Sequence, residues 1–257
     1  MNWLGTVTAI VNQKGGVGKS TTAVNLGAYL AAAGKKVLLI DLDPQGNATS
    51  GVGVDKSQLS RCMYDVVMEE CTLRDIIHPT EVPGLDVAPA TIELAGAEIE
   101  LVAVMSREYR VQRALEPERD RYDYVLIDSP PSLGLLTLNG MTAADGVLIP
   151  IQCEFYALEG LSQLMKTIEM VRHHLNPSLE VHGVLLTMFD ARTNLSHQVA
   201  EDVRAYFEGR VRVFNTVIPR NIRLSEAPSF GKPVLLYDDR SRGAEAYRQL
   251  AAEVMAL

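Results

Sequence analysis

The sequence predicts an α/β fold, a single doubly wound and mainly parallel β-sheet flanked by helices. Short apolar runs alternate with helical segments along the chain, which is the order that right-handed βαβ crossovers produce. The run Val37–Leu42 is apolar throughout, as expected of a strand covered on both faces. The 257 residues are 47% hydrophobic and contain no internal repeat or linker, so we predict one domain over residues 1–257.

In the first half of the chain, apolar runs bounded by turn residues predict four strands. Gly34 is a typical residue for ending the first helix, and Pro117 follows the end of the second. Residues 44–84 are rich in loop-forming residues, with short helical pieces at 63–68 and 73–77. The predicted strands are Val7–Val11, Val37–Leu42, Leu85–Ala88 and Tyr124–Ile127, and the predicted helices are Lys19–Ala33 and Ile92–Leu115.

The second half continues the alternation of strands and helices. The helix predicted at 158–175 has apolar residues at helical spacing (Leu161, Leu164, Met165, Ile168 and Val171), which we interpret as core positions. The predicted strands here are Gly146–Ile151, Val181–Thr187 and Val213–Ile218, and the other predicted helices are Leu133–Ala143, Leu195–Phe207 and Ala244–Ala256.

The stretch from Asn12 to Thr21 lies between the first strand and the first helix and is rich in glycine. Glycines allow successive backbone N–H groups to converge on one anion, and the following helix adds its free first-turn donors and its dipole. We expect Lys19 to reach the β- and γ-phosphates of a nucleotide and the Ser20 hydroxyl to hold Mg²⁺. The usual phosphate-loop pattern has a glycine where this chain has Gln13, and Lys14 directly precedes the first glycine.

Three aspartates follow strands of the predicted sheet. Asp41 and Asp43 end the second strand, and Asp128 follows the apolar strand Tyr124–Ile127. Ligands of open α/β sheets bind outside the carboxyl ends of the strands, so these carboxylates are expected near the phosphate loop. Asp128 is placed to hold Mg²⁺ through water, and of Asp41 and Asp43 one suits the water shell of the metal and the other the attacking water. The alternative for Asp41 and Asp43 is an ordinary solvated strand end.

The net charge of −8 excludes a global basic field, so nucleic-acid binding requires a local patch. The segment Gly209–Pro233 has five cations against one carboxylate, a local charge of +4, and Arg192 is a further candidate. The alternative is a solvated face that carries arginines. The segment's charged residues are Arg210, Arg212, Arg220, Arg223, Lys232 and Glu226.

The remaining features indicate a cytoplasmic protein. Cys62, Cys71 and Cys153 lack metal-ligand spacing and are interpreted as reduced thiols. The segment Met1–Gly5 does not have the pattern of a signal peptide, and no run of about 18 apolar residues predicts a membrane span.

Together these motifs resemble the ParA/MinD group of P-loop ATPases with a deviant Walker A motif. The resemblance lies in Lys14–Thr21, in 41–45 (Asp-Leu-Asp-Pro-Gln) and in 128–131 (Asp-Ser-Pro-Pro). Segments 189–194 and 218–229 resemble the short chromosomal ParA (Soj) type, and the likeness covers nearly the whole chain. A chromosome- or plasmid-partitioning ATPase is therefore implied.

The resemblance also implies residue roles. ATP and Mg²⁺ bind and drive formation of a sandwich homodimer, in which Lys14 reaches the phosphates held by the other subunit. In its own subunit Lys19 serves the nucleotide and Ser20 the metal. Asp43 positions the hydrolytic water, Asp41 and Asp128 support Mg²⁺, and Pro219 and Asn221 lie near the adenine. The implied nucleotide-binding set is Lys14, Gly15, Gly16, Val17, Gly18, Lys19, Ser20, Thr21, Pro219 and Asn221.

The implied partners are DNA and a centromere-binding protein. Arg192, Arg220 and Arg223 are the candidates for contacting double-stranded DNA through its phosphates without sequence preference, which would place the protein on the nucleoid. A ParB-type protein would stimulate slow hydrolysis and reset the dimer.

Two relatives of the same core remain as alternatives. A MinD-like membrane ATPase requires a basic amphipathic C-terminal helix, but residues 244–257 contain one arginine and two glutamates, so we predict that this helix packs on the core. An iron protein of the nitrogenase type needs paired cysteines for an iron–sulfur cluster, and none of the three cysteines fits that place.

Overall fold

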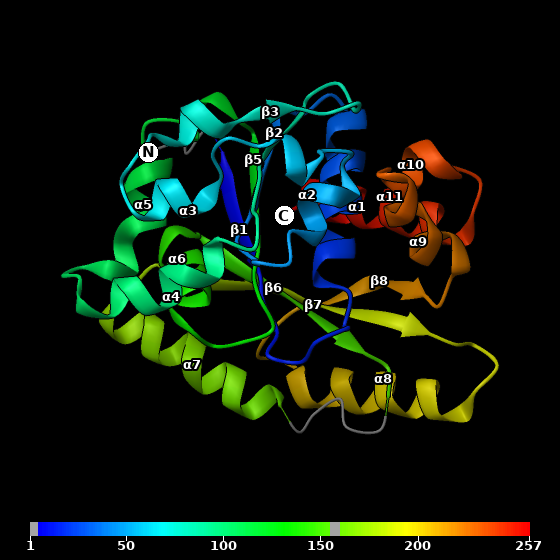
Figure 1. Ribbon diagram of the computed structural model, residues 1–257. Helices are drawn as coiled ribbons and strands as arrows, with labels where there is room; N and C mark the ends of the chain where they lie inside the picture. Colours follow the sequence, from blue (N-terminus) through cyan, green and yellow to red (C-terminus); the bar gives the residue numbers. More distant parts are fainter. Residues whose placement is uncertain (1–4, 155–159) are drawn as a thin grey trace.

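Eight strands form one sheet through the centre of the molecule (Figure 1). The structure is a computed structural model that describes residues 5–154 and 160–257. The strand order is β3-β4-β2-β5-β1-β6-β7-β8, and every neighbouring pair is parallel except β3–β4. The strands are β1 (Thr6–Ile10), β2 (Val37–Asp41), β3 (His78–Pro79), β4 (Leu85–Ala88), β5 (Tyr124–Asp128), β6 (Gly146–Gln152), β7 (Glu180–Phe189) and β8 (Val213–Pro219).

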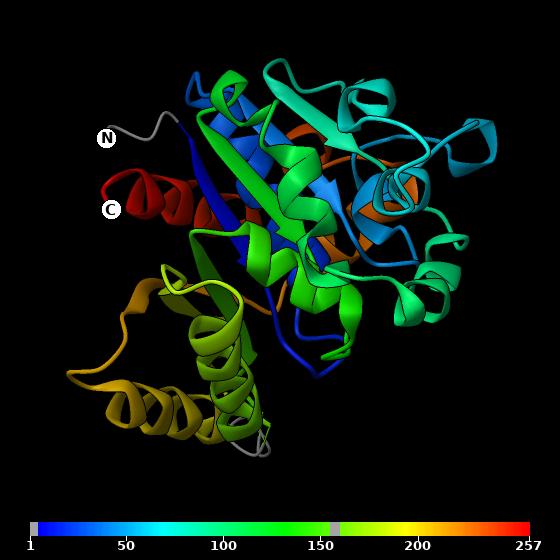
Figure 2. The ribbon, with the colours of Figure 1, turned by 90° about the vertical axis from the view of Figure 1, so that its left-hand side faces the viewer.

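Helices cover both faces of this sheet, which confirms the predicted doubly wound α/β fold. In Figure 2 the helices coloured cyan to green lie in front of the strands. The α-helices are α1 (Lys19–Ala32), α2 (Asn47–Gly51), α3 (Met63–Val67), α4 (Leu94–Glu100), α5 (Arg110–Leu115), α6 (Leu135–Ala143), α7 (Leu161–His174), α8 (Asn194–Phe207), α9 (Ile222–Glu226), α10 (Val234–Tyr237) and α11 (Arg242–Met255). Single turns of 3₁₀-helix are η1 (Lys56–Gln58), η2 (Leu73–Ile76), η3 (Leu101–Ala103), η4 (Arg107–Tyr109), η5 (Arg119–Arg121) and η6 (Ala227–Phe230).

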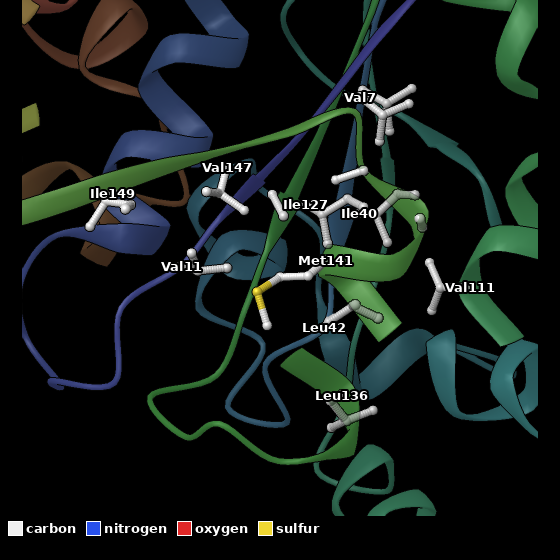
Figure 3. Close-up of a cluster of buried hydrophobic side chains, with 14 of the residues drawn as sticks. Val7, Val11, Ile40, Leu42, Val111, Ile127, Leu136, Met141, Val147 and Ile149 are labelled. Carbon is white, nitrogen blue, oxygen red and sulfur yellow. The ribbon is translucent and has the colours of Figure 1, made fainter. Parts of the chain in front are cut away.

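The hydrophobic core is divided by the sheet into two clusters. Strand β2 shows why, because Leu38 and Ile40 face the cluster under α3 to α8, whereas Val37 and Leu39 face the cluster under α1, α10 and α11. Figure 3 shows part of the first cluster, including Ile127 of β5 and Met141 of α6. Successive strand residues point to opposite faces, so a strand covered on both sides must be apolar throughout.

The long helix predicted at 92–115 is wrong, because the structure divides it into α4 and α5. Ser106 lies between them with a φ of 54°, a left-handed conformation that interrupts a helix. Asn139 on α6 stabilises the break, donating its side-chain amide to the Arg107 carbonyl (2.8 Å) and accepting from the backbone N–H of Val111 (3.2 Å). A tertiary contact thus replaces hydrogen bonds that a continuous helix would make.

Other differences from the sequence prediction are short elements. Helices α2, α9 and α10 and the antiparallel edge strand β3 were not predicted, because each is too short to carry a periodic pattern. The predicted start of a helix at Leu158 and most of the N-terminal segment lie outside the described residues.

The C-terminal helix α11 packs on α1 and β8, as predicted. Tyr247, Leu250 and Ala251 are buried, and the hydroxyl of Tyr247 lies 3.1 Å from that of Thr22 on α1. Within residues 5–154 and 160–257, no helix combines the length and apolar character that crossing a bilayer requires.

Candidate functional site

The predicted site residues meet at the carboxyl ends of the three central strands. The phosphate loop follows β1, and in the ladder Asp128 at the end of β5 is paired with Ile10 of β1 and with Asp41 of β2. The sequence prediction that Asp41 and Asp128 lie beside the loop is therefore consistent with the strand register. Ligands of open α/β sheets bind outside the carboxyl ends of the strands, which is where these residues lie.

The loop is held in a shape that exposes its backbone donors. Gly16 and Gly18 have φ angles of 74° and 91°, which favour glycine. The Thr187 hydroxyl donates to the Val17 carbonyl (2.9 Å), which fastens the loop to β7. No side chain caps the start of α1 at Gly18, so its first-turn N–H groups remain available to an anion.

Lys19 is buried at the start of α1, with 6% of its surface exposed. Its ammonium donates to the carbonyl of Lys14 across the loop (3.2 Å). Burial lowers the pKa of Lys19, while the nearby Asp128 and Asp43 carboxylates act in the opposite direction. The loop therefore encloses a cation that a phosphate group can compensate.

Asp128 is fully buried, and neither carboxylate oxygen has a hydrogen-bond partner among the described residues. Burial, followed by the charge of Asp41, raises the pKa of Asp128 well above its usual range, whereas Ser20 and Lys19 oppose this shift. A buried unpartnered carboxylate is costly unless a cation compensates it. Together with the Ser20 hydroxyl, these oxygens fit a Mg²⁺ ion that keeps several waters.

Asp41 is also fully buried, but its oxygens already have partners. One oxygen accepts the backbone N–H of Asp43 (3.1 Å), and the other accepts the backbone N–H (2.8 Å) and the hydroxyl (2.7 Å) of Thr49. Burial raises the pKa of Asp41 to about 6 despite these hydrogen bonds. Asp41 thus fixes the turn after β2 and the helix α2, and its predicted support of Mg²⁺ stays a prediction.

A cavity of about 590 Å³ opens in front of the loop. Asp43 lines it and is 6% exposed, and its carboxylate accepts the backbone N–H of Gln45 (2.9 Å). The short helix α2 and the turn η6, which lie next to each other, also line the cavity. Sequence reasoning missed the lining residues of these two elements: Asn47, Ser50 and Gly51 from α2, and Ala227, Pro228 and Ser229 from η6, with the neighbouring Lys232.

A second cavity of about 610 Å³ continues from the first, because Gly18, Thr21, Met188 and Pro228 line both. The predicted adenine residues Pro219 and Asn221 lie here, among mostly apolar side chains that include Ile218, Leu224 and Tyr247. The oxygen of the Asn221 side chain caps α9 by accepting from the backbone N–H of Arg223 (2.9 Å). The structure therefore brings the phosphate loop and Asn221 to one continuous space.

Lys14 is placed differently from Lys19. Its side chain is 45% exposed and its ammonium lies 3.9 Å from the Glu154 carboxylate. It lines another cavity, of about 780 Å³, and is not among the residues that line the cavity in front of the phosphate loop. Within one chain the two lysine ammonium groups are not brought together.

The arginines predicted to bind DNA lie at the carboxyl ends of β7 and β8, each beside a carboxylate. Arg192 pairs with Asp190 (2.7 Å) and Arg220 with Glu154 (3.4 Å). Arg223 pairs with Glu226 (2.8 Å) and Asp238 (3.2 Å). The arginine of every pair is exposed, and ion pairs at the surface contribute little to stability and are readily exchanged.

The single +4 patch expected from the sequence is wrong. Arg210 and Arg212 precede β8 and Arg220 follows it, so a strand of seven residues separates the two groups by roughly 23 Å. The net charge counted over Gly209–Pro233 also left out three carboxylates that pair with these arginines from other parts of the sequence: Glu154, Asp190 and Asp238.

The three cysteines are free thiols. Cys62 is buried at the start of α3, where its sulfur accepts from the backbone N–H of Tyr64 (3.4 Å). Cys153 is buried, and burial raises its pKa to about 11. These environments are those of structural cysteines.

Comparison with known proteins gives consistent matches over nearly the whole chain. Residues 5–181 match the AAA domain family AAA_31. The chain is 62% identical to the sporulation initiation inhibitor protein Soj of Bacillus subtilis (98% of this chain, 99% of that protein). It is 59% identical to the chromosome partitioning protein ParA of Caulobacter vibrioides (97% and 94%). A crystal structure of cobyrinic acid a,c-diamide synthase from Mycobacterium smegmatis, with bound ADP and magnesium, superposes with a TM-score of 0.86 at 40% identity (97% and 94%).

Proposed function

Because the chain belongs to the Soj/ParA family of chromosome-partitioning ATPases, we propose that ATP joins two copies into a sandwich dimer that binds DNA without sequence preference. The chain is an ATPase that uses ATP and Mg²⁺. In the proposed cycle, a ParB-type partner stimulates hydrolysis, which separates the copies and releases the DNA. The name of the Mycobacterium smegmatis structure denotes a synthase, but identity to the chromosome partitioning protein ParA of Caulobacter vibrioides is higher, at 59% against 40%.

The observation that carries this proposal is the position of Lys14. Its backbone carbonyl accepts a hydrogen bond from Lys19, so the peptide belongs to the phosphate loop. Its ammonium nevertheless lies outside the phosphate cavity, half exposed, beside Glu154. A cation held next to one nucleotide site but directed away from it is suited to the nucleotide of a second copy.

Each residue of the site has a separate role in the proposed phosphoryl transfer. The glycine loop and Lys19 hold the phosphates, and Ser20 and Asp128 would hold Mg²⁺, which neutralises charge on the β- and γ-phosphates when it is bound. Asp43 faces the same cavity and would orient the attacking water. Lys14 of the second copy would add positive charge where negative charge develops, so hydrolysis depends on pairing.

The proposed DNA contacts follow from the same pairing. Arg192, Arg220 and Arg223 are exposed at one end of the sheet, and their carboxylate partners weaken the field of a single copy. Two copies present twice as many arginines to one duplex. Binding through phosphates sums over contacts, so a dimer is retained on DNA under conditions in which a single chain is released.

The experiment that tests the proposal measures retention on double-stranded DNA of arbitrary sequence with ATP, with ADP and without nucleotide. We expect retention only with ATP, and with six phosphate contacts a loss of affinity of about a thousandfold between 50 and 200 mM salt. Arg223→Ala removes one contact from each copy, so it should weaken binding and lower the salt slope by about two. Arg210→Ala, at the other end of β8, is the matched control. Equal retention in all three nucleotide conditions would contradict the proposal.

Asp43→Ala should still bind ATP and DNA but hydrolyse ATP about a hundredfold more slowly, because the attacking water loses its orienting carboxylate. Phosphate release at saturating ATP, in the presence of DNA, measures the effect. The control is Asp120→Ala, which removes an exposed carboxylate outside the cavity. Unchanged turnover of the Asp43 variant would remove Asp43 from this role.

A further inference from the structure

Met188 lies at the junction of the two cavities of the nucleotide site. It lines the cavity in front of the phosphate loop and also the cavity that contains Pro219 and Asn221. Its side chain is half-buried in the isolated chain. A nucleotide that extends from the loop to Asn221 passes the residues that line both cavities, and Met188 is one of them.

The backbone at Met188 has a conformation that its residue type disfavours. Its φ is 50°, in the left-handed region, and among the described residues only Glu69 and Ser106 share a positive φ without being glycine. Glu69 follows α3 and Ser106 separates two helical segments, whereas Met188 lies inside the strand β7. A long side chain in this conformation within a strand is uncommon and persists only where the surroundings impose it.

A β-bulge explains how the strand accommodates this conformation. The ladder pairs Leu186 with Val217 and Phe189 with Pro219, so three steps along β7 correspond to two steps along β8. One extra residue of β7 therefore lies between these pairs. Bulges of this kind redirect a side chain and are frequent beside active sites.

The residues on either side of Met188 are firmly held. The Thr187 hydroxyl donates to the Val17 carbonyl in the phosphate loop (2.9 Å), and the Thr187 carbonyl accepts from the backbone N–H of Cys153 (3.0 Å). The carbonyl of Phe189 accepts from the backbone N–H of Arg220 (3.0 Å). The bulge is thus fixed between the loop that binds phosphate and the segment that begins the base cavity.

We propose that Met188 is the side chain that contacts the nucleobase, with its thioether against the face of the ring. The inference rests on the proposed nucleotide site and names a residue that contacts the base within it. A thioether cannot recognise ring nitrogens by strong hydrogen bonds, but it packs favourably on an aromatic face and adapts to its shape. In this arrangement Met188 contributes contact with the ring, and the edge of the base is left to Asn221 and the backbone.

The test compares a nucleotide with a ligand that has phosphates and no base. Calorimetric titration with ADP and with inorganic tripolyphosphate, both with Mg²⁺, is applied to the wild type, Met188→Gly and Met188→Leu. Glycine removes the side chain at a φ that glycine tolerates, while leucine keeps an apolar side chain of similar size. Thermal unfolding establishes that each variant is folded.

We expect Met188→Gly to weaken ADP binding about five- to tenfold, the upper part of the range for a lost sulfur–aromatic contact, and to leave tripolyphosphate binding unchanged. Met188→Leu should lose about twofold or less because it keeps most of the contact. ADP binding of Met188→Gly equal to the wild type would overturn the inference, as would an equal loss for both ligands, which would assign Met188 to the shape of the loop. A wild type that binds neither ligand would instead contradict the proposed nucleotide site.

Discussion

Lys19→Ala is expected to abolish measurable ATP binding and, with it, hydrolysis and retention on DNA. The Lys19 ammonium is the buried cation of the phosphate loop, and burial already lowers its pKa. Removing one partner of a buried charged contact weakens binding by about 2–5 kcal/mol, which corresponds to about 30- to several-thousand-fold. Calorimetric titration with Mg-ATP measures the loss.

The variant should remain folded, which makes the loss of binding interpretable. Alanine is well tolerated at the start of α1, and among the described residues the Lys19 side chain hydrogen-bonds only the Lys14 carbonyl. Lys36→Ala, which removes an exposed lysine that lines neither nucleotide cavity, is the matched control. If Lys19→Ala bound ATP within about threefold of the wild type, the assignment of the phosphate loop would be wrong.

The central part of the fold and site could be predicted from the sequence because both follow from local patterns. The apolar run of β2 and the glycine loop before α1 each carry a signal within a few residues, and parallel strands bring their carboxyl ends together. Asp41 and Asp128 were therefore placed together correctly. Their difference was not predictable from the strand pattern. Thr49 hydrogen-bonds Asp41, whereas the Asp128 carboxylate has no hydrogen-bond partner among the described residues.

The features that the sequence did not predict depend on contacts between distant segments. Asn139 breaks the helix expected at 92–115, and Glu154 lies 66 residues from Arg220, with which it pairs. The bulge at Met188 depends on the register between β7 and β8, which no local pattern specifies. Such contacts determine the charge and shape of the site. The sequence therefore predicted which residues lie near the phosphate loop, but not the hydrogen bonds and ion pairs that these residues make.

Lys14→Ala is expected to separate nucleotide binding from pairing. In a single chain the Lys14 side chain lies outside the phosphate cavity, so Mg-ATP should bind the variant within about threefold of the wild type. ATP-induced dimerisation and retention on DNA should be lost, because the phosphates of each copy no longer meet a cation from the other. Sedimentation velocity with ATP, in the Asp43→Ala background that slows hydrolysis, measures pairing.

A mixture of Lys14→Ala and Lys19→Ala chains distinguishes action across the interface from action within one chain. The Lys14→Ala chain keeps Lys19 and binds ATP, and the Lys19→Ala chain keeps Lys14 and can supply it to that ATP. A mixed pair therefore contains one complete site, and turnover should reappear on mixing although each variant alone is inactive. If Lys14 acted on its own nucleotide, neither chain would hold a complete site and mixing would restore nothing. If Lys14→Ala alone paired and stayed on DNA like the wild type, the proposed dimer mechanism would be contradicted.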